Sequence, residues 1–298
     1  MGLGCGGPSR LGLKIGGSEA EAERVVREAL SLGVNFIDTA ESYETEEVVG
    51  RAIRGIARDR VVLSTKEGVG WKNRRCTATE MKDRVEASLR RLAVDAVDIL
   101  HLHGVSRDEY NYARRELVPA LLDLREQGKV RYIGITEAFG GDTGHAMLSE
   151  AVRDDCWDVM MVGFNLLNQS ARDRVLAATR EQGVGTLCMF AVRRALAVPD
   201  NLRTVMAHLA ERALVDADGF DPEDPLGFLL ENETAASLPD AAYRFCRWEP
   251  GLDIILSGTS SIEHLRENAA SLARPPLPPA KVERLRQMFA RVDCIAGN

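Results

Sequence analysis

Gly33-Val-Asn-Phe-Ile-Asp-Thr-Ala-Glu-Ser-Tyr43 joins the end of a helical pattern to a short apolar run and then to a polar loop. Before it, residues 20–32 place four apolar side chains on one face, as an amphipathic helix does. Gly33 stands where such a helix stops, and the apolar run 34–37 follows directly. Short apolar runs bounded by Gly and polar residues are typical of buried parallel strands. This stretch therefore predicts one repeat of an α/β fold.

The same unit recurs on both sides of this stretch. Short apolar runs alternate with amphipathic segments, and residues 2–5 are a candidate for one more run at the start. The runs are residues 34–37, 61–63, 97–102, 130–135, 159–164, 184–189 and 253–256. About eight strand–helix repeats with no Ser/Gly linker or Pro-rich tract between them favour one closed barrel over two doubly wound halves. We therefore expect a single-domain (β/α)8 barrel over residues 1–298.

One stretch departs from this rhythm. Residues 190–236 are polar and interrupted by Pro, and we expect a long loop excursion after the seventh strand, with its own helix near 200–213. Residues 278–298 are expected to form a C-terminal helix and tail.

Composition excludes several classes of protein. The 298 residues are 45% hydrophobic and 28% charged, which is ordinary for a globular protein and unlike a disordered or collagen-like chain. The formal net charge is 38 − 45 = −7, which disfavours non-specific nucleic-acid binding. No apolar run approaches the roughly 20 residues that span a bilayer, and no secretory signal precedes the first run, so we expect no membrane partner and a cytoplasmic location. The six cysteines form no C-x-x-C pair, and we expect no metal site.

Polar residues gather at the ends of the predicted strands, where barrels carry their chemistry. Asp38 ends the second strand with Tyr43 just after it, Lys66 ends the third, and His101 and His103 end the fourth. A tyrosine, whose reference pKa is about 10, is a weak acid at neutral pH, and a nearby ammonium lowers that pKa. A carboxylate can hold the ammonium, and an imidazole can orient a carbonyl. The set therefore predicts proton-transfer chemistry.

These residues carry a resemblance to a known family. The stretch 33–43, followed by Glu47-Val-Val-Gly50, resembles the first signature of the aldo-keto reductases, and further blocks match at 62–66, 98–103, 128–134 and 257–268. The resemblance implies a barrel that binds NADP(H) without a Rossmann domain. It implies that Tyr43 is the acid/base, that Lys66 and Asp38 tune it, and that His103 orients the substrate. We expect a structural role for His101, with its side chain directed away from the site. The formal match of residues 2–7 to the dinucleotide fingerprint G-x-G-x-x-G is weak, because no strand precedes it.

The resemblance also implies the cofactor contacts, with departures around the nicotinamide. Thr136-Glu137 stands where the family has Ser-Asn, Met161 where it has Gln, and Met189, beside Phe190, where it has a stacking aromatic residue. His264 stands where an Arg often meets the 2′-phosphate, which predicts a modest preference for NADP(H). The chain also starts directly on the first barrel strand, so the family's N-terminal hairpin is expected to be missing. The candidate cofactor residues are Thr136, Glu137, Asn165, Met189, Phe190, Ser257, Gly258, Thr259, Ser260, Ser261, His264, Glu267 and Asn268.

Three functions remain open at this point. The first is NADPH-dependent reduction of a small-molecule aldehyde or ketone, with Tyr43 as proton donor. The altered residues Glu137, Met161 and Met189 favour a second, an NADP(H)-binding sensor with little turnover. The third is a non-redox barrel enzyme that uses Tyr43 and Lys66 to abstract a proton. The sequence does not indicate the substrate or the oligomeric state.

Overall fold

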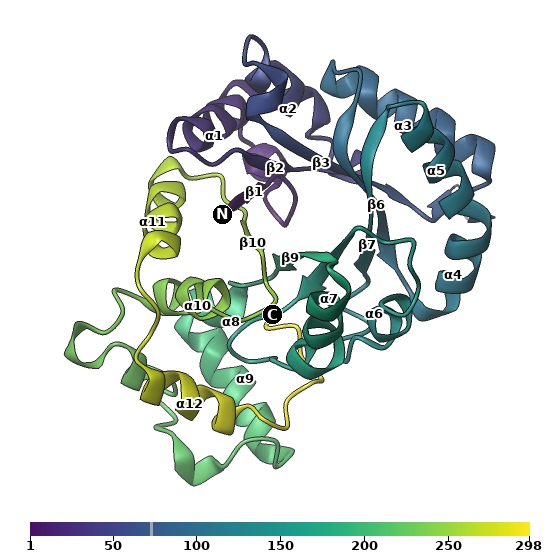
Figure 1. Ribbon diagram of the computed structural model, residues 1–298. Coiled ribbons are helices and arrows are strands. Elements are labelled where there is room, and N and C mark those ends of the chain that lie inside the picture. Colours follow the sequence, from purple (N-terminus) through teal and green to yellow (C-terminus); the bar gives the residue numbers. More distant parts are fainter. Residues whose placement is uncertain (72–73) are drawn as a thin grey trace.

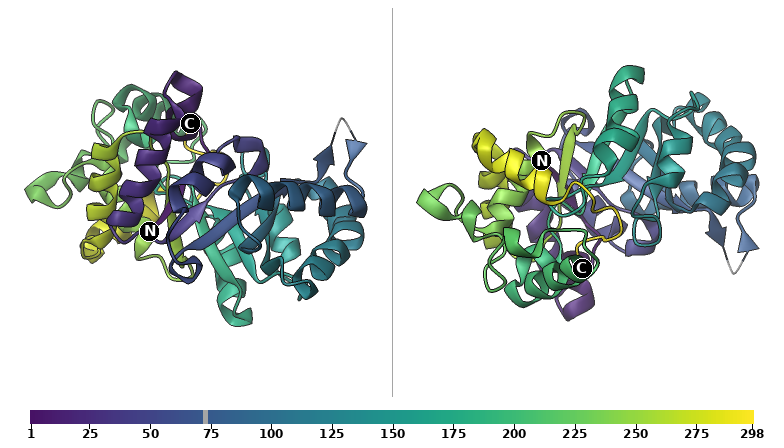
Figure 2. Two further views of the ribbon diagram at one scale, coloured as in Figure 1. Left: turned by 90° about the horizontal axis from the view of Figure 1, so that it is seen from above. Right: turned by 90° about the horizontal axis from the view of Figure 1, so that it is seen from below.

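The computed structural model describes residues 1–71 and 74–298, and it contains the expected closed (β/α)8 barrel (Figure 1). Eight parallel strands close in the order β1-β10-β9-β8-β7-β6-β3-β2. The strands are β1 (Gly2–Gly4), β2 (Phe36–Asp38), β3 (Val62–Gly68), β6 (Val97–Val105), β7 (Val130–Glu137), β8 (Val159–Gly163), β9 (Gly185–Met189) and β10 (Ile254–Ser257). Two further strands, β4 (Gly70–Trp71) and β5 (Arg74–Arg75), pair as a small antiparallel sheet at the edge of the molecule (Figure 2).

Helices surround the barrel and cover its outer face (Figure 1). They are α1 (Glu19–Ser31), α2 (Glu46–Ile53), α3 (Ala78–Leu92), α4 (Arg107–Tyr112), α5 (Val118–Glu126), α6 (Ala146–Ala151), α7 (Ala177–Gln182), α8 (Arg194–Ala197), α9 (Pro199–Glu211), α10 (Leu238–Arg247), α11 (Ile262–Ala273) and α12 (Pro279–Met288). Within the described ranges, every helix is too short or too polar to cross a bilayer.

Side-chain caps begin several of these helices. The Ser18 and Glu21 side chains form a capping box at α1, and Thr77 and Glu80 form another at α3. At α11 the cap is Ser261, whose hydroxyl accepts from the backbone N–H of His264.

The barrel interior is packed with apolar side chains from several strands. Phe36, Ile99, Val159, Met161 and Leu187 form one buried cluster inside the ring of strands. Because all eight strands are parallel, their carboxyl ends lie at one end of this packed core, and side chains that follow them meet there.

Strand β3 is longer than the apolar run 61–63 that predicted it. Residues Ser64–Glu67 are polar but fully buried, and the strand continues through them because each finds a hydrogen-bonding or ionic partner. This extension places Lys66 inside the barrel wall instead of in a loop.

After β9 the chain makes a long excursion before it returns to the barrel. Residues 190–236 contain α8, α9 and three short 3-10 turns, and α10 follows. At the other end of the chain, residues 295–297 lead back from α12 to the middle of the barrel (Figure 1). The Gly297 carbonyl accepts from the backbone N–H of Ala195, which holds this tail against α8.

Candidate active site

A buried ion pair lies at the centre of the candidate site. Lys66 on β3 has no exposed side-chain surface, and its ammonium donates to Asp38 Oδ2 at 2.6 Å and to the carbonyl of Thr39 at 2.7 Å. Ser64 donates to the other carboxylate oxygen of Asp38 at 2.8 Å. Burial is the largest effect on the Lys66 ammonium and lowers its pKa, but Asp38, with smaller contributions from Tyr43 and Cys5, outweighs it and raises that pKa. Lys66 is therefore a fixed positive charge at neutral pH.

Tyr43 sits on a short 3-10 turn, Glu41–Tyr43, that follows β2; we call these three residues the tyrosine turn. The Lys66 ammonium lies 4.8 Å from the centre of the Tyr43 ring. Gly6 also lies directly against the ring, because a Cβ built at Gly6 would lie 2.5 Å from Tyr43 Cε2. Burial raises the pKa of the Tyr43 phenol, and Lys66 only partly offsets this. The phenol therefore keeps its proton at neutral pH, and the net lowering of its pKa expected from the sequence is not found.

His103 completes the group from β6. Its Nε2 lies 3.3 Å from the Tyr43 hydroxyl, and its Nδ1 lies 3.4 Å from the Ser42 hydroxyl. Burial, reinforced by the Lys66 charge, lowers the pKa of the His103 imidazole to about 3. The ring is therefore neutral at physiological pH, with one nitrogen able to donate and the other able to accept.

His101 does not point away from this site as the sequence analysis expected. Residues two apart on a strand face the same side, so His101 lies beneath His103 on the inner face of β6. Its ring packs on Gly134, where an added Cβ would be 2.2 Å from His101 Nδ1. It is fully buried, which fits the expected structural role.

The polar residues expected around the nicotinamide already have protein partners. The Thr136 hydroxyl accepts from the backbone N–H of Gly104 at 2.6 Å. The Glu137 carboxylate accepts from the N–H of Gly163 at 2.7 Å and lies 3.0 Å from Nδ1 of His145, and both side chains are fully buried. Nothing in the sequence indicates that His145 meets Glu137, so this contact appears only in the folded chain.

The Asn165 side chain also makes its hydrogen bonds within the protein. Its side-chain oxygen accepts from the backbone N–H groups of Leu167 and Asn168, both at 3.0 Å. Its amide nitrogen donates to the carbonyl of Ala296, in the tail that returns over the barrel.

Met189 and Phe190 end β9. Met189 packs against the apolar cluster inside the barrel, to which Met161 belongs. Phe190 has a positive φ of 69°, and its ring stacks on Phe139 with a centroid distance of 5.8 Å. The guanidinium of Arg193 lies 4.0 Å from the centre of the Phe190 ring. Phe190 therefore belongs to an aromatic and cationic stack at the rim of the barrel.

The third group of candidates surrounds the turn between β10 and α11. The Ser257 hydroxyl is buried between Tyr243, at 2.9 Å, and the Asn268 amide, at 3.0 Å. Thr259 Oγ1 accepts from the N–H of Ser261 at 3.0 Å, whereas His264 and Glu267 are exposed on α11. A Cβ at Gly258 would lie 3.1 Å from the carbonyl of Gly4, so this turn runs close to β1. The turn ends at the N-terminus of the 12-residue helix α11. The free backbone N–H groups and the helix dipole at such a terminus favour binding of an anion.

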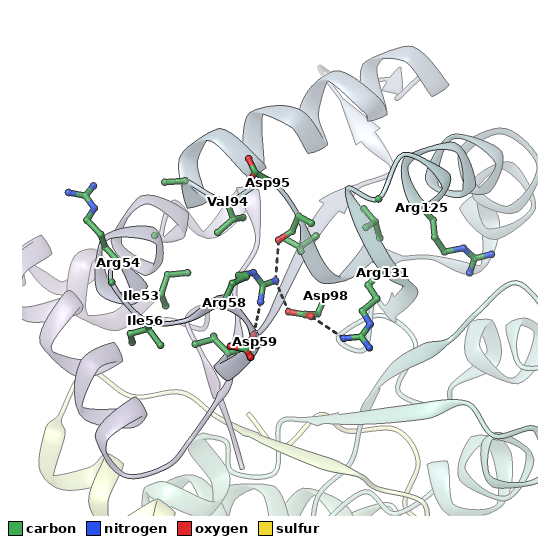
Figure 3. A pocket seen from close by; sticks show the side chains of 18 residues that line it. Ile53, Arg54, Ile56, Arg58, Asp59, Val94, Asp95, Asp98, Arg125 and Arg131 are labelled. Atoms are coloured by element: carbon green, nitrogen blue, oxygen red, sulfur yellow. Dashed lines mark hydrogen bonds and ion pairs between the residues drawn. The ribbon is translucent and has the colours of Figure 1, made fainter.

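A cavity of about 930 Å³ lies elsewhere, lined by residues at the amino ends of β3, β6 and β7 (Figure 3). Three of its charged side chains are paired with one another, since Arg58 lies 2.7 Å and Arg131 3.9 Å from Asp98. The catalytic candidates stand at the carboxyl ends, so this cavity is not the site.

Comparisons with known proteins now define the class of this chain. A sequence model described as "Aldo/keto reductase family" matches residues 3–290. The chain belongs to the aldo/keto reductase family and is an NAD(P)H-dependent oxidoreductase.

Two relatives and two solved structures show which particular proteins this chain resembles. The chain is 27% identical to the NADH-specific methylglyoxal reductase of Escherichia coli (strain K12), over 89% of this chain and 90% of that protein. It is 35% identical to the L-galactose dehydrogenase of Arabidopsis thaliana, over 44% of this chain and 43% of that protein. Among solved structures, the holo form of an aldo-keto reductase from Bacillus halodurans superposes with a TM-score of 0.73 at 22% identity, covering 97% of this chain and 91% of that one. A Klebsiella pneumoniae aldo/keto reductase in complex with NADP and acetate gives 0.66 at 24% identity, covering 99% and 94%.

Proposed function

We propose that this protein reduces the carbonyl group of a small molecule with NADPH and that Tyr43 donates the proton to the carbonyl oxygen. The observation that carries the proposal is the convergence of Tyr43, His103 and Lys66, held by Asp38, at the carboxyl ends of three neighbouring strands. A protonated phenol beside a fixed ammonium and a neutral imidazole is suited to protonating a developing alkoxide.

Each residue has a role that follows from its surroundings. Tyr43 keeps its proton until the carbonyl oxygen becomes basic. The Lys66 ammonium then stabilises the phenolate that Tyr43 leaves behind, and Asp38 holds that ammonium in place. His103, neutral at physiological pH, can donate one hydrogen bond to the same carbonyl oxygen and so orient it.

The turn before α11 fits the phosphate-bearing end of the cofactor. The hydroxyls of Ser260 and Ser261 and the backbone N–H groups at the helix start would hold a phosphate, and Gly258 lets the turn approach β1. His264, Glu267 and Asn268 would lie along the nucleotide. When bound, the nicotinamide cofactor supplies the hydride that reduces the carbonyl carbon.

A second candidate is a sensor that binds NADP(H) with little turnover. One observation supports this candidate. Glu137 and Asn165 stand where the carboxamide of the nicotinamide would be held, yet both make their hydrogen bonds within the protein. Met161 and Met189 replace polar or aromatic groups with thioethers, which are weak acceptors.

One experiment separates the two candidates. Purified protein is mixed with NADPH and a panel of aldehydes, quinones and keto sugars, and both NADPH oxidation and alcohol product are measured. If the protein is a reductase, one molecule of alcohol should form per molecule of NADPH oxidised for at least one substrate class. Tight NADPH binding with no product from any of them would support the sensor, and absence of binding would contradict both.

A further inference from the structure

A buried charge cluster lies directly behind the lysine strand. Glu67, the residue after Lys66, has no exposed side-chain surface. The guanidinium of Arg84, on α3, lies 2.9 Å from Glu67 and 2.5 Å from the Glu41 carboxylate. Arg84 also donates to the carbonyl of Gly68 at 2.8 Å. One guanidinium thus joins β3 to the first residue of the tyrosine turn.

The cluster continues toward α2. Ser88 lies 2.7 Å from Glu67 and 3.1 Å from Glu46, and Arg91 lies 2.7 Å from Glu46. Glu46 also accepts from Thr65 at 2.6 Å. The cluster therefore contains a second carboxylate–guanidinium pair alongside the first.

Among the residues that the structure describes, this cluster has one more carboxylate than guanidinium. It holds the carboxylates of Glu41, Glu46 and Glu67 against the guanidiniums of Arg84 and Arg91. The single hydroxyl proton of Ser88 faces oxygens of both Glu67 and Glu46 and can satisfy one of them at a time. An uncompensated buried charge is costly, so one carboxyl proton is needed to balance the group.

This cluster is linked to the candidate catalytic residues through two short connections. Glu67 is bonded in sequence to Lys66, whose side chain faces the opposite side of β3. Glu41 begins the tyrosine turn, in which Ser42 contacts His103 and Tyr43 lies beside Lys66. A movement of Glu41 away from Glu67 would therefore carry Tyr43 away from Lys66.

We propose that Arg84 and one proton held between Glu41 and Glu67 position the tyrosine turn against the lysine strand, so that carbonyl reduction requires this proton. The inference rests on the proposed role of Tyr43 in reduction. Glu41, Glu67 and Arg84 are positioning residues, because none of them touches the reacting groups.

The surroundings of the pair favour retention of the proton near neutral pH. Burial is the main cause that raises the pKa of Glu67, to about 8, with Arg84 opposing and Glu41 adding to the rise. Burial is the largest effect on Glu41 and acts to raise its pKa, but the hydrogen bonds with Arg84 and Glu67 and the charges of Arg84 and Arg91 together outweigh it and lower that pKa. Among the described residues, Arg84 also faces the thiol of Cys76, whose pKa burial raises, so that thiol stays neutral. The proton therefore resides on Glu67 and leaves as the pH rises through about 8.

The test compares Glu67→Gln, which keeps a neutral hydrogen-bonding side chain, with the matched control Glu47→Gln on the exposed face of α2. The turnover number at saturating NADPH and substrate is measured from pH 6 to pH 9.5. For wild type and the control we expect roughly a tenfold fall between pH 7 and pH 9, as a single group titrating near pH 8 gives. For Glu67→Gln the value at pH 9 should stay within about twofold of its own value at pH 7, because the amide cannot lose a proton. Tyr43, with its pKa raised above 10, does not titrate in this range.

The test also includes the unfolding temperature, a measurement that does not depend on turnover. A raised carboxyl pKa in the folded protein means that stability from this group is lost as the pH rises from about 4.5 to about 8. The unfolding temperature of wild type should therefore fall relative to that of Glu67→Gln across this range.

The two proposals fail in different ways. Absence of reduction by wild type at every pH overturns the proposed function and this inference with it. Wild-type reduction that stays flat from pH 7 to pH 9, or an equal alkaline fall in wild type and Glu67→Gln, overturns this inference alone.

Discussion

At the scale of single residues, burial and the neighbouring charges together set the protonation states of this site. Lys66 remains an ammonium inside the barrel because Asp38 and the carbonyl of Thr39 replace its water. Tyr43 stays protonated because the loss of water around its phenol outweighs the nearby ammonium. The two effects together give a proton donor next to a charge that stabilises its conjugate base.

Gly6 offers a direct test of how tightly Tyr43 is held. Gly6→Ala adds a Cβ that would lie 2.5–2.8 Å from three atoms of the Tyr43 ring, so the ring must move. A displacement of about 1 Å can cost roughly 10²-fold in rate, and we expect the turnover number to fall by about that much with little change in NADPH affinity. The control is Gly140→Ala, where an added Cβ meets nothing within 4 Å. Equal turnover in the two variants would show that Gly6 does not fix the tyrosine.

Part of the site could be predicted from the sequence because its residues follow strand ends. Asp38, Lys66 and His103 sit on neighbouring strands, so a strand pattern alone predicts that they meet. The Glu137–His145 pair could not be predicted, because it depends on how one loop folds back over β7 and β8. The raised pKa of Tyr43 was also missed, since desolvation depends on packing that the sequence does not display.

At the scale of elements, the N-terminus of α11 is the part on which cofactor preference depends. The turn 258–261 brings three hydroxyl residues, Thr259, Ser260 and Ser261, to the start of this helix, and His264 is exposed on its first turn. An imidazole at this place can donate a hydrogen bond to the 2′-phosphate that distinguishes NADPH from NADH.

We therefore expect NADPH to bind more tightly than NADH. In His264→Ala the ratio of the two affinities should be smaller, because the hydrogen bond to the 2′-phosphate is lost. Fluorescence titration of wild type and variant with both cofactors measures this. The preference of the similar E. coli protein for NADH makes the comparison necessary. Equal affinity of wild type for the two cofactors, or an unchanged ratio in His264→Ala, would remove the assignment of the 2′-phosphate to His264.

At the scale of the whole molecule, the barrel was predictable because its repeat is regular. A helix, a Gly stop and a buried strand recur along the chain, and closure follows from their number. The path of residues 190–236 and of the tail was not predictable in this way, because neither segment has a periodic pattern. Their contacts with Asn165, α8 and the rim of the barrel arise only in the folded chain.

The central claim is that Tyr43 is the proton donor of a carbonyl reductase. The most direct measurement is single-turnover reduction of a confirmed substrate by Tyr43→Phe at saturating NADPH, with NADPH affinity measured on the same protein. Phenylalanine keeps the ring against Gly6 but has no proton to give, and general acid catalysis contributes roughly 10²–10⁴-fold. We predict a fall in the rate of reduction of at least 10²-fold with NADPH affinity nearly unchanged. Reduction by Tyr43→Phe at a rate near that of wild type would contradict the account.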